Sequence, residues 1–82
     1  MDKPTVGRIV HYFERDARDT NMKIIPIAAI ITEVLEGHEN NPVILTLFIP
    51  GAVRCVNKPV YQGTGKGCWN WPKKEVSLIV NT

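Results

Sequence analysis

Residues 24–34 read IIPIAAIITEV and form the longest nearly unbroken apolar run of the chain. Most of these residues are branched at Cβ, which favours an extended strand over a helix. We therefore predict a central strand over residues 27–34, covered on both faces, with Ile30 in the core. A buried helix, which Ala28 and Ala29 would tolerate, is the alternative. A membrane span needs about 20 apolar residues, and Glu33 interrupts the run before that length.

A second apolar run, VILTLFI at residues 43–49, follows the turn-forming sequence HENNP at residues 38–42. Two apolar strands separated by such a turn predict an antiparallel hairpin. It closes at Pro50 and Gly51, a pair typical of type I and type II turns.

The rest of the chain supplies further short strand candidates, separated by turn signals and without a convincing amphipathic helix. They are residues 6–12 (VGRIVHY), with a bulge or a close backbone approach at Gly7, residues 52–56 (AVRCV), residues 68–72 (CWNWP) and residues 75–80 (EVSLIV). Residues 13–23 are charge-dense, and we expect a solvated loop there. Five or six short strands predict an all-β fold, either a small antiparallel SH3-like barrel or a sandwich.

The length of 82 residues corresponds to one domain, 1–82, with a core over residues 4–72 and an extra strand at 75–80. A domain of this size has a thin core, so we expect a homo-oligomer. The polar N-terminus lacks the apolar stretch of a signal peptide, which predicts a cytoplasmic protein without a membrane span. Two cysteines, Cys55 and Cys68, are expected to be free thiols in that compartment.

The residues able to carry catalysis do not form a known pattern. His11, His38, Cys55, Cys68 and Ser77 lack the spacing of a nucleophile elbow, of a Cys/His catalytic signature or of a zinc site. The sequence therefore predicts neither an enzyme nor a bound metal or cofactor.

A candidate anion site lies in the last third of the chain, which is locally basic. Gly63, Gly65 and Gly67 surround Lys66, so backbone N–H groups in this loop can form an anion-binding nest. The alternative is a hairpin tip that needs glycine for its dihedral angles.

Two tryptophans follow this loop. On a strand, Trp69 and Trp71 point to the same face, where they can stack on a base or fill the core. We expect Arg54 or His11 to complete the polar set, and Tyr12, on the opposite face from His11, to join the core. The predicted ligand-binding residues are thus Trp69, Trp71, Lys66, Gly65, Arg54 and His11.

The ordered motifs VGRIVHY, AAIITEV, VILTLFIPG and GCWNWP resemble a group of short proteins encoded by tailed bacteriophages and prophages. The resemblance covers residues 4–72, and this chain continues for ten residues beyond Pro72. It implies a phage origin and the cytoplasm of an infected bacterium, rather than a particular activity.

Three functions fit these features. Our first hypothesis is a non-enzymatic sponge that sequesters an anionic nucleotide immune signal, such as a cyclic dinucleotide or an ADP-ribose derivative. The alternatives are a module that binds a host or virion protein and a small barrel that binds nucleic acid. The net charge of +2 is small for a nucleic-acid partner. A mixed aromatic and basic pocket would favour the sponge, and an exposed apolar patch would favour the interaction module.

Overall fold

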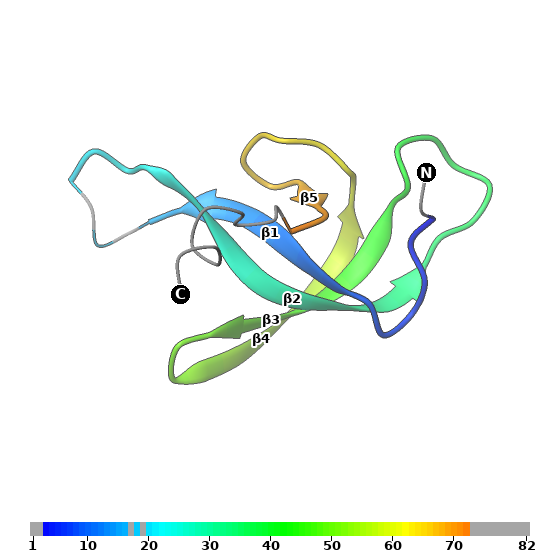
Figure 1. Cartoon of the computed structure of the whole chain (residues 1–82), viewed down its shortest axis with the longest axis horizontal. Coiled ribbons are helices and arrows are strands. Elements are labelled where there is room, and N and C mark those ends of the chain that lie inside the picture. The colour runs from blue at the N-terminus through cyan, green and yellow to red at the C-terminus, as the bar shows by residue number, and fades with distance from the viewer. Residues whose placement is uncertain (1–2, 17, 19, 73–82) are drawn as a thin grey trace, which may run out of the picture.

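The structure, a computed structural model, describes residues 3–16, 18 and 20–72. The described chain contains strands β1 (Ile9–Arg15), β2 (Ile24–Val34), β3 (Val43–Ile49), β4 (Ala52–Val60) and β5 (Trp69–Asn70), and no helix. They form one antiparallel sheet in the order β4-β3-β2-β1-β5 (Figure 1). The all-β class is therefore confirmed, with β2 as the central strand. The strand expected over residues 75–80 lies outside the described residues.

The hairpin of β2 and β3 is confirmed by its register, in which Ala28 pairs with Phe48 and Ile31 with Leu45. The turn before β3 contains Asn40 and Asn41 at φ 64° and 48°. Asparagine tolerates this left-handed region because its short side chain can hydrogen-bond locally. Between β3 and β4, Gly51 at φ 84° follows Pro50, as in a type II turn.

Several predicted element boundaries need correction. The central strand begins at Ile24 and not at Ile27, and the strand predicted over residues 68–72 spans only Trp69–Asn70. The first strand begins at Ile9 and not at Val6. Just before it, the Gly7 N–H donates to the Ile31 carbonyl at 2.8 Å and the Ile31 N–H donates to the Arg8 carbonyl at 3.0 Å. Gly7, at φ 93°, and Arg8 thus lie opposite the single residue Ile31, as in the predicted bulge or close backbone approach. The first strand continues to Arg15, into the segment predicted as loop, and β4 continues past residue 56 to Val60.

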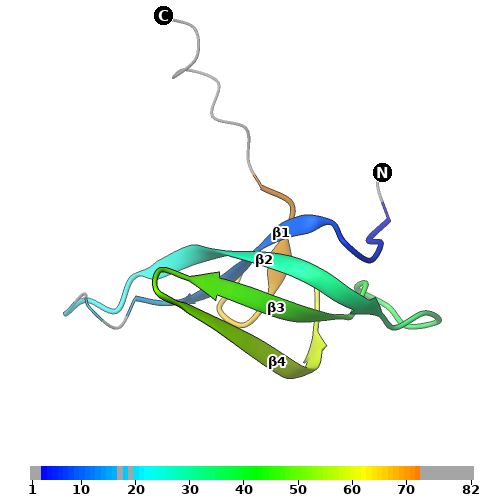
Figure 2. The same cartoon turned by 90° about the horizontal axis from the view of Figure 1, so that it is seen from below.

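The sheet is strongly curled, as in an SH3-like barrel, but it does not close (Figure 2). Irregularities in register between Ile31 and Glu33, and between Val43 and Leu45, increase its bend. The two edges approach just after β4, where the Trp69 N–H donates to the Tyr61 carbonyl at 3.0 Å and the Gly63 N–H to the Trp69 carbonyl at 2.9 Å. This contact holds β5 near the end of β4 and encloses the core.

The core fills the concave face of the sheet. Its fully or almost fully buried members are Val10, Ala29, Ile31, Val43, Leu45, Leu47, Val60 and Trp69, with Tyr12 and Trp71 packed against them. Ile31 is fully buried, whereas the neighbouring Ile30 points to the opposite, outer face and is half-buried. The prediction that β2 is covered on both faces and that Ile30 belongs to the core is therefore wrong. Successive side chains of a strand alternate between faces, and in the described chain nothing packs over the outer one.

Candidate functional site

Trp69 and Trp71 share the core face, as the sequence predicted, with ring centres 5.2 Å apart in an edge-to-face contact. Trp69 has no exposed surface, and its indole N–H donates to the Asn41 carbonyl at 2.9 Å. Trp71 is half-buried, and the Arg8 guanidinium lies 4.7 Å from its ring centre. The expectation that Trp69 stacks on a base therefore needs correction, because the ring is fully buried in the core and no face of it is open to a ligand.

A side-chain amide network fixes the surroundings of Trp69. Asn41 donates to Gln62 at 2.7 Å, and Gln62 donates to Asn70 at 3.2 Å. Asn70 in turn donates to the Gly63 carbonyl at 3.2 Å and accepts from the Trp71 N–H at 2.9 Å. Sequence reasoning misses this network, because the contact of Asn41 with Gln62, 21 positions away, follows only from the tertiary structure.

The glycine loop at residues 63–67 uses backbone groups that an anion nest would need. The Gly67 N–H donates to the Phe13 carbonyl at 2.7 Å, and the Cys68 N–H to the Gly65 carbonyl at 3.1 Å. With the Gly63 N–H also bonded to Trp69, these amides are not available to phosphate. Lys66 and Gly65 are exposed at the loop surface.

The remaining predicted ligand residues do not converge on this loop. Arg54 lies on β4 and forms an ion pair with Glu14 of β1, Nη2 to Oε1 2.6 Å. His11 pairs with Ala28 and Asn70, which places it on the outer face, away from the side chains of Tyr12 and Trp69. The predicted nucleotide-binding set is therefore divided between two faces and two sheet edges.

A hollow lies elsewhere, between the start of β2 and the β3–β4 turn. It is a cleft of about 570 Å³. Ile25, Pro26, Ile27 and Ala28 form one wall; Phe48, Ile49 and Pro50 form the other. We call it the proline cleft.

Two prolines explain why the strands separate there. The last β2–β3 pair is Ala28 with Phe48, and the same register would next place Pro26 opposite Pro50. The Ile31 N–H donates to Arg8, towards β1. In an antiparallel ladder successive residues point their backbone groups to alternate sides, so Ala28, Pro26 and Ile24 turn theirs towards β3. Proline has no N–H, so this ladder cannot continue at Pro26 and Pro50.

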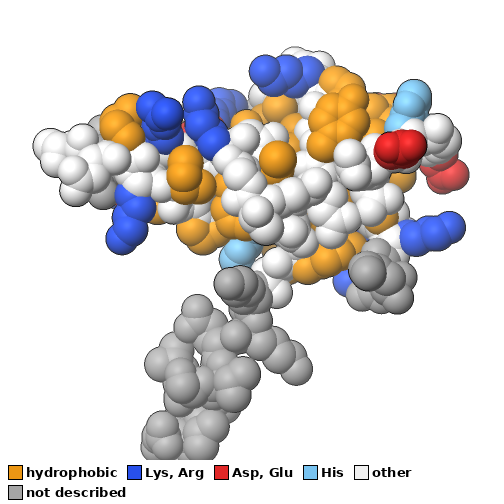
Figure 3. Space-filling view, turned by 90° about the horizontal axis from the view of Figure 1, so that it is seen from above, with side chains coloured by type: hydrophobic (Ala, Val, Ile, Leu, Met, Phe, Trp, Pro, Cys, Tyr) orange, Lys and Arg blue, Asp and Glu red, His pale blue; other side chains and the backbone are white. Residues whose placement is uncertain are grey.

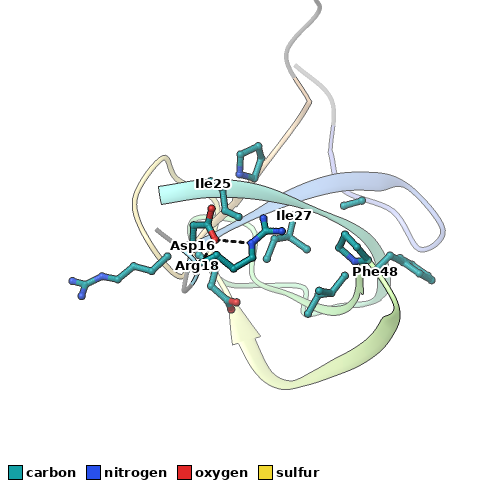
Figure 4. Close-up of a pocket in the computed structure, with 11 residues that line it drawn as sticks. Asp16, Arg18, Ile25, Ile27 and Phe48 are labelled. Carbon is teal, nitrogen blue, oxygen red and sulfur yellow. Dashed lines mark hydrogen bonds and ion pairs between the residues drawn. The ribbon is translucent and has the colours of Figure 1, made fainter. Parts of the chain in front are cut away.

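Charged side chains from the end of β1 and the following loop border the cleft. Arg18 donates to the Asp16 carboxylate through its backbone N–H at 3.0 Å and through Nε at 3.1 Å. The backbone hydrogen bond from Arg18, followed by that from its side chain, lowers the pKa of Asp16 below its usual value. Figure 4 shows the Arg18 side chain extending from Asp16 towards Ile27, with Phe48 across the cleft. Glu14 and Arg15 also line the cleft. Asp16 is paired with Arg18 and Glu14 with Arg54, so among the described residues of this border Arg15 is the cation without an ion pair.

The outer face of the sheet is continuous with this cleft. Phe48 lines the cleft and is 42% exposed, and it pairs with Val53, which is 64% exposed. Further apolar side chains of this face are Ile9, Ile24, Pro26, Ala28, Ile30 and Ile44. Figure 3 looks onto the other side, that of the β4–β5 connection, where hydrophobic side chains are scattered among polar ones and several Lys and Arg lie towards the end that carries the β1–β2 loop. We call Pro26, Ala28, Phe48 and Val53 the apolar patch.

Other chemistry in the described residues is limited. No group of three or more His, Cys, Asp or Glu side chains there is placed to hold a metal ion. Both cysteines are free thiols, Cys55 exposed and Cys68 half-buried. No helix within residues 3–16, 18 and 20–72 has the length and apolarity to cross a membrane. No family model, curated protein or solved structure matched the chain.

Proposed function

We propose that the protein is a non-enzymatic interaction module that binds an extended apolar segment of another protein. The carrying observation is the continuity of the proline cleft with the apolar patch through Phe48. Exposed apolar patches bordered by polar groups are characteristic of protein interaction sites. A cleft of about 570 Å³ has room for one or two large side chains as anchors.

The chemistry of the cleft also specifies the partner segment. Its walls are aliphatic and aromatic, so the anchors are expected to be residues such as Leu, Ile or Phe. Arg15 at the border favours an acidic residue beside these anchors, since complementary charge speeds association and sets orientation, whereas Arg18 is already paired with Asp16. Ile24 directs its backbone groups to the side of β2 that faces β3, where an extended segment can hydrogen-bond to them.

A nucleotide sponge has less support than this module. Stacking would require an exposed indole, and Trp69 is fully buried. Phosphate binding would require free loop amides, and those of Gly63, Gly67 and Cys68 are bonded within the chain. The resemblance to short phage proteins suggests the setting, in which the module acts in the cytoplasm of an infected bacterium on a host or virion protein.

A displayed library of random peptides tests this proposal without knowledge of the natural partner. We expect the protein to select peptides that combine two apolar residues with an acidic one. Phe48→Ser should abolish binding of the selected peptides. Val6→Ser is the matched control, because Val6 is 66% exposed but lies outside both the cleft and the patch.

The outcomes separate the alternatives once melting curves show that both variants are folded. Loss of binding in Phe48→Ser with retention in Val6→Ser supports the proposal. Equal binding by both variants, or selection of no apolar peptide, contradicts it.

A further inference from the structure

Strand β4 is the long edge strand of the sheet, and its outer side pairs with no strand among the described residues. From Ala52 to Pro59 every residue except Val56 is exposed. An exposed edge strand presents unpaired N–H and C=O groups and is a template for a further strand. This edge is distinct from the proline cleft and takes no part in the proposed function.

The register identifies which backbone groups face outwards. Ala28 and Ile30 direct theirs to β3, where they pair with Phe48 and Thr46. By alternation Leu45 and Leu47 direct theirs to Val56 and Arg54 of β4. Val56 and Arg54 thus point their backbone groups towards β3. The alternate residues of β4 point theirs to the free edge, and these are Val53, Cys55 and Asn57.

We propose that a second copy of the chain pairs antiparallel along this edge, with Cys55 opposite Cys55 of the partner copy. A two-fold axis at Cys55 then places Val53 opposite the partner's Asn57, so each copy offers the same donors and acceptors to the other. Arg54 lies opposite the partner's Val56, and no like charges meet directly within residues 53–57. Pro59 lacks an N–H and ends the pairing-competent run.

Charge and shape favour a second copy over an unrelated strand. Arg54, the cation in the middle of the edge, is already neutralised by Glu14 at 2.6 Å, so two edges approach without strong repulsion. The pairing also joins the outer faces of the two sheets, bringing the two exposed Cys55 side chains together and placing each exposed Val53 diagonally across from the partner's Cys55. A short strand pair buries less than the roughly 800 Å² per partner of a standard interface. The dimer is therefore expected to depend on concentration.

Light scattering on the reduced full-length protein across a range of concentrations tests the dimer. The wild type should rise towards twice the monomer mass. Cys55→Arg, which sets two arginines against each other at the axis, should remain monomeric. Thr64→Arg adds the same charge at an exposed loop position and should behave like the wild type.

Cross-linking tests the register. With Cys68 replaced by Ser, a dipyridyl disulfide oxidant should join two Cys55 thiols, releasing two thiopyridones for each disulfide. Residues exchanging both hydrogen bonds have Cα atoms about 5.5 Å apart, within reach of a disulfide. A single cysteine moved to position 64 by Thr64→Cys, with both native cysteines changed to Ser, is the control. A monomer at all concentrations, or equally rapid cross-linking at position 64, overturns the proposal.

Discussion

The two ends of the sheet differ in whether their backbone N–H and C=O groups are hydrogen-bonded within the chain. At the closed end, where the β2–β3 turn meets the β4–β5 connection, the carbonyls of Asn41 and Gly63 accept hydrogen bonds from Trp69 and Asn70. At the open end, Pro26 and Pro50 remove the donors that would continue the β2–β3 ladder. The closed end holds a buried indole, and the open end holds a cleft.

Under our proposal, the closed end of the sheet contributes to the stability of the fold, and the open end binds a partner. Side chains that stabilise the fold must be covered, which is why Trp69 serves the core and not a ligand. Side chains that bind a partner must be uncovered before the partner arrives, as Phe48 and Val53 are.

Trp69→Ala should lower the free energy of unfolding by about 3–5 kcal/mol, because it empties the largest buried volume of the core. That is a large share of the about 5–15 kcal/mol that stabilises a typical domain. Urea denaturation followed by circular dichroism measures the loss. Trp71→Ala should cost less, since Trp71 is only half-buried. If the two substitutions cost the same, Trp69 is not the centre of the closed end.

Ile31→Ala and Ile30→Ala compare the two faces of β2 at adjacent positions. Ile31 is fully buried, so its truncation should cost about 2–5 kcal/mol. Ile30 lies on the outer face, and its truncation should cost about 1 kcal/mol. Thermal or urea unfolding of both variants gives the comparison. A larger loss for Ile30→Ala would mean that the outer face is covered.

Asn70→Ala should cost about 1–3 kcal/mol, because it leaves Gln62 and the Gly63 carbonyl without the hydrogen bonds that Asn70 makes. Asn57→Ala is the matched control, since Asn57 is exposed and surface substitutions of this kind change stability by less than about 0.5 kcal/mol. Both values come from urea denaturation at a concentration where the protein is monomeric. Equal losses of stability in the two variants would mean that the amide network does not stabilise the closed end.

The smallest effect concerns the loop that borders the cleft. The hydrogen bonds from Arg18 lower the pKa of Asp16, so the carboxylate favours the folded loop above the usual aspartate pKa of about 3.9. This contribution is lost as the pH falls through the lower folded pKa, and it is constant near neutrality. An NMR titration should show the Arg18 amide resonance shifting only in acid. A shift between pH 5 and 7 would contradict the pairing with Asp16.

The sequence predicts the fold well because its apolar runs and turn residues are local signals. IIPIAAIITEV and VILTLFI are adjacent strands, and the Asn40–Asn41 and Pro50–Gly51 turns connect β2 to β3 and β3 to β4. Local pattern does not decide which face of an apolar strand is covered. For this reason Ile30 was expected in the core, and Trp69 was expected in a ligand site.

The proline cleft was not predicted, although its signal is present in the sequence. Pro26 and Pro50 are separated by 24 positions, and their opposition follows only once the β2–β3 register is known. The amide network and the Arg54–Glu14 ion pair depend in the same way on tertiary contacts. Long-range register is thus the information that sequence reasoning lacked.

An NMR titration of the backbone amides tests most directly whether binding belongs to the open end. The ligands are a peptide selected from the displayed library and, separately, a cyclic dinucleotide. The account predicts that the peptide shifts the amides of residues 25, 27, 28, 48, 49 and 53, and that the dinucleotide shifts none in the loop at residues 63–67. Dinucleotide shifts in that loop, with no peptide shifts around the proline cleft, would contradict the central claim.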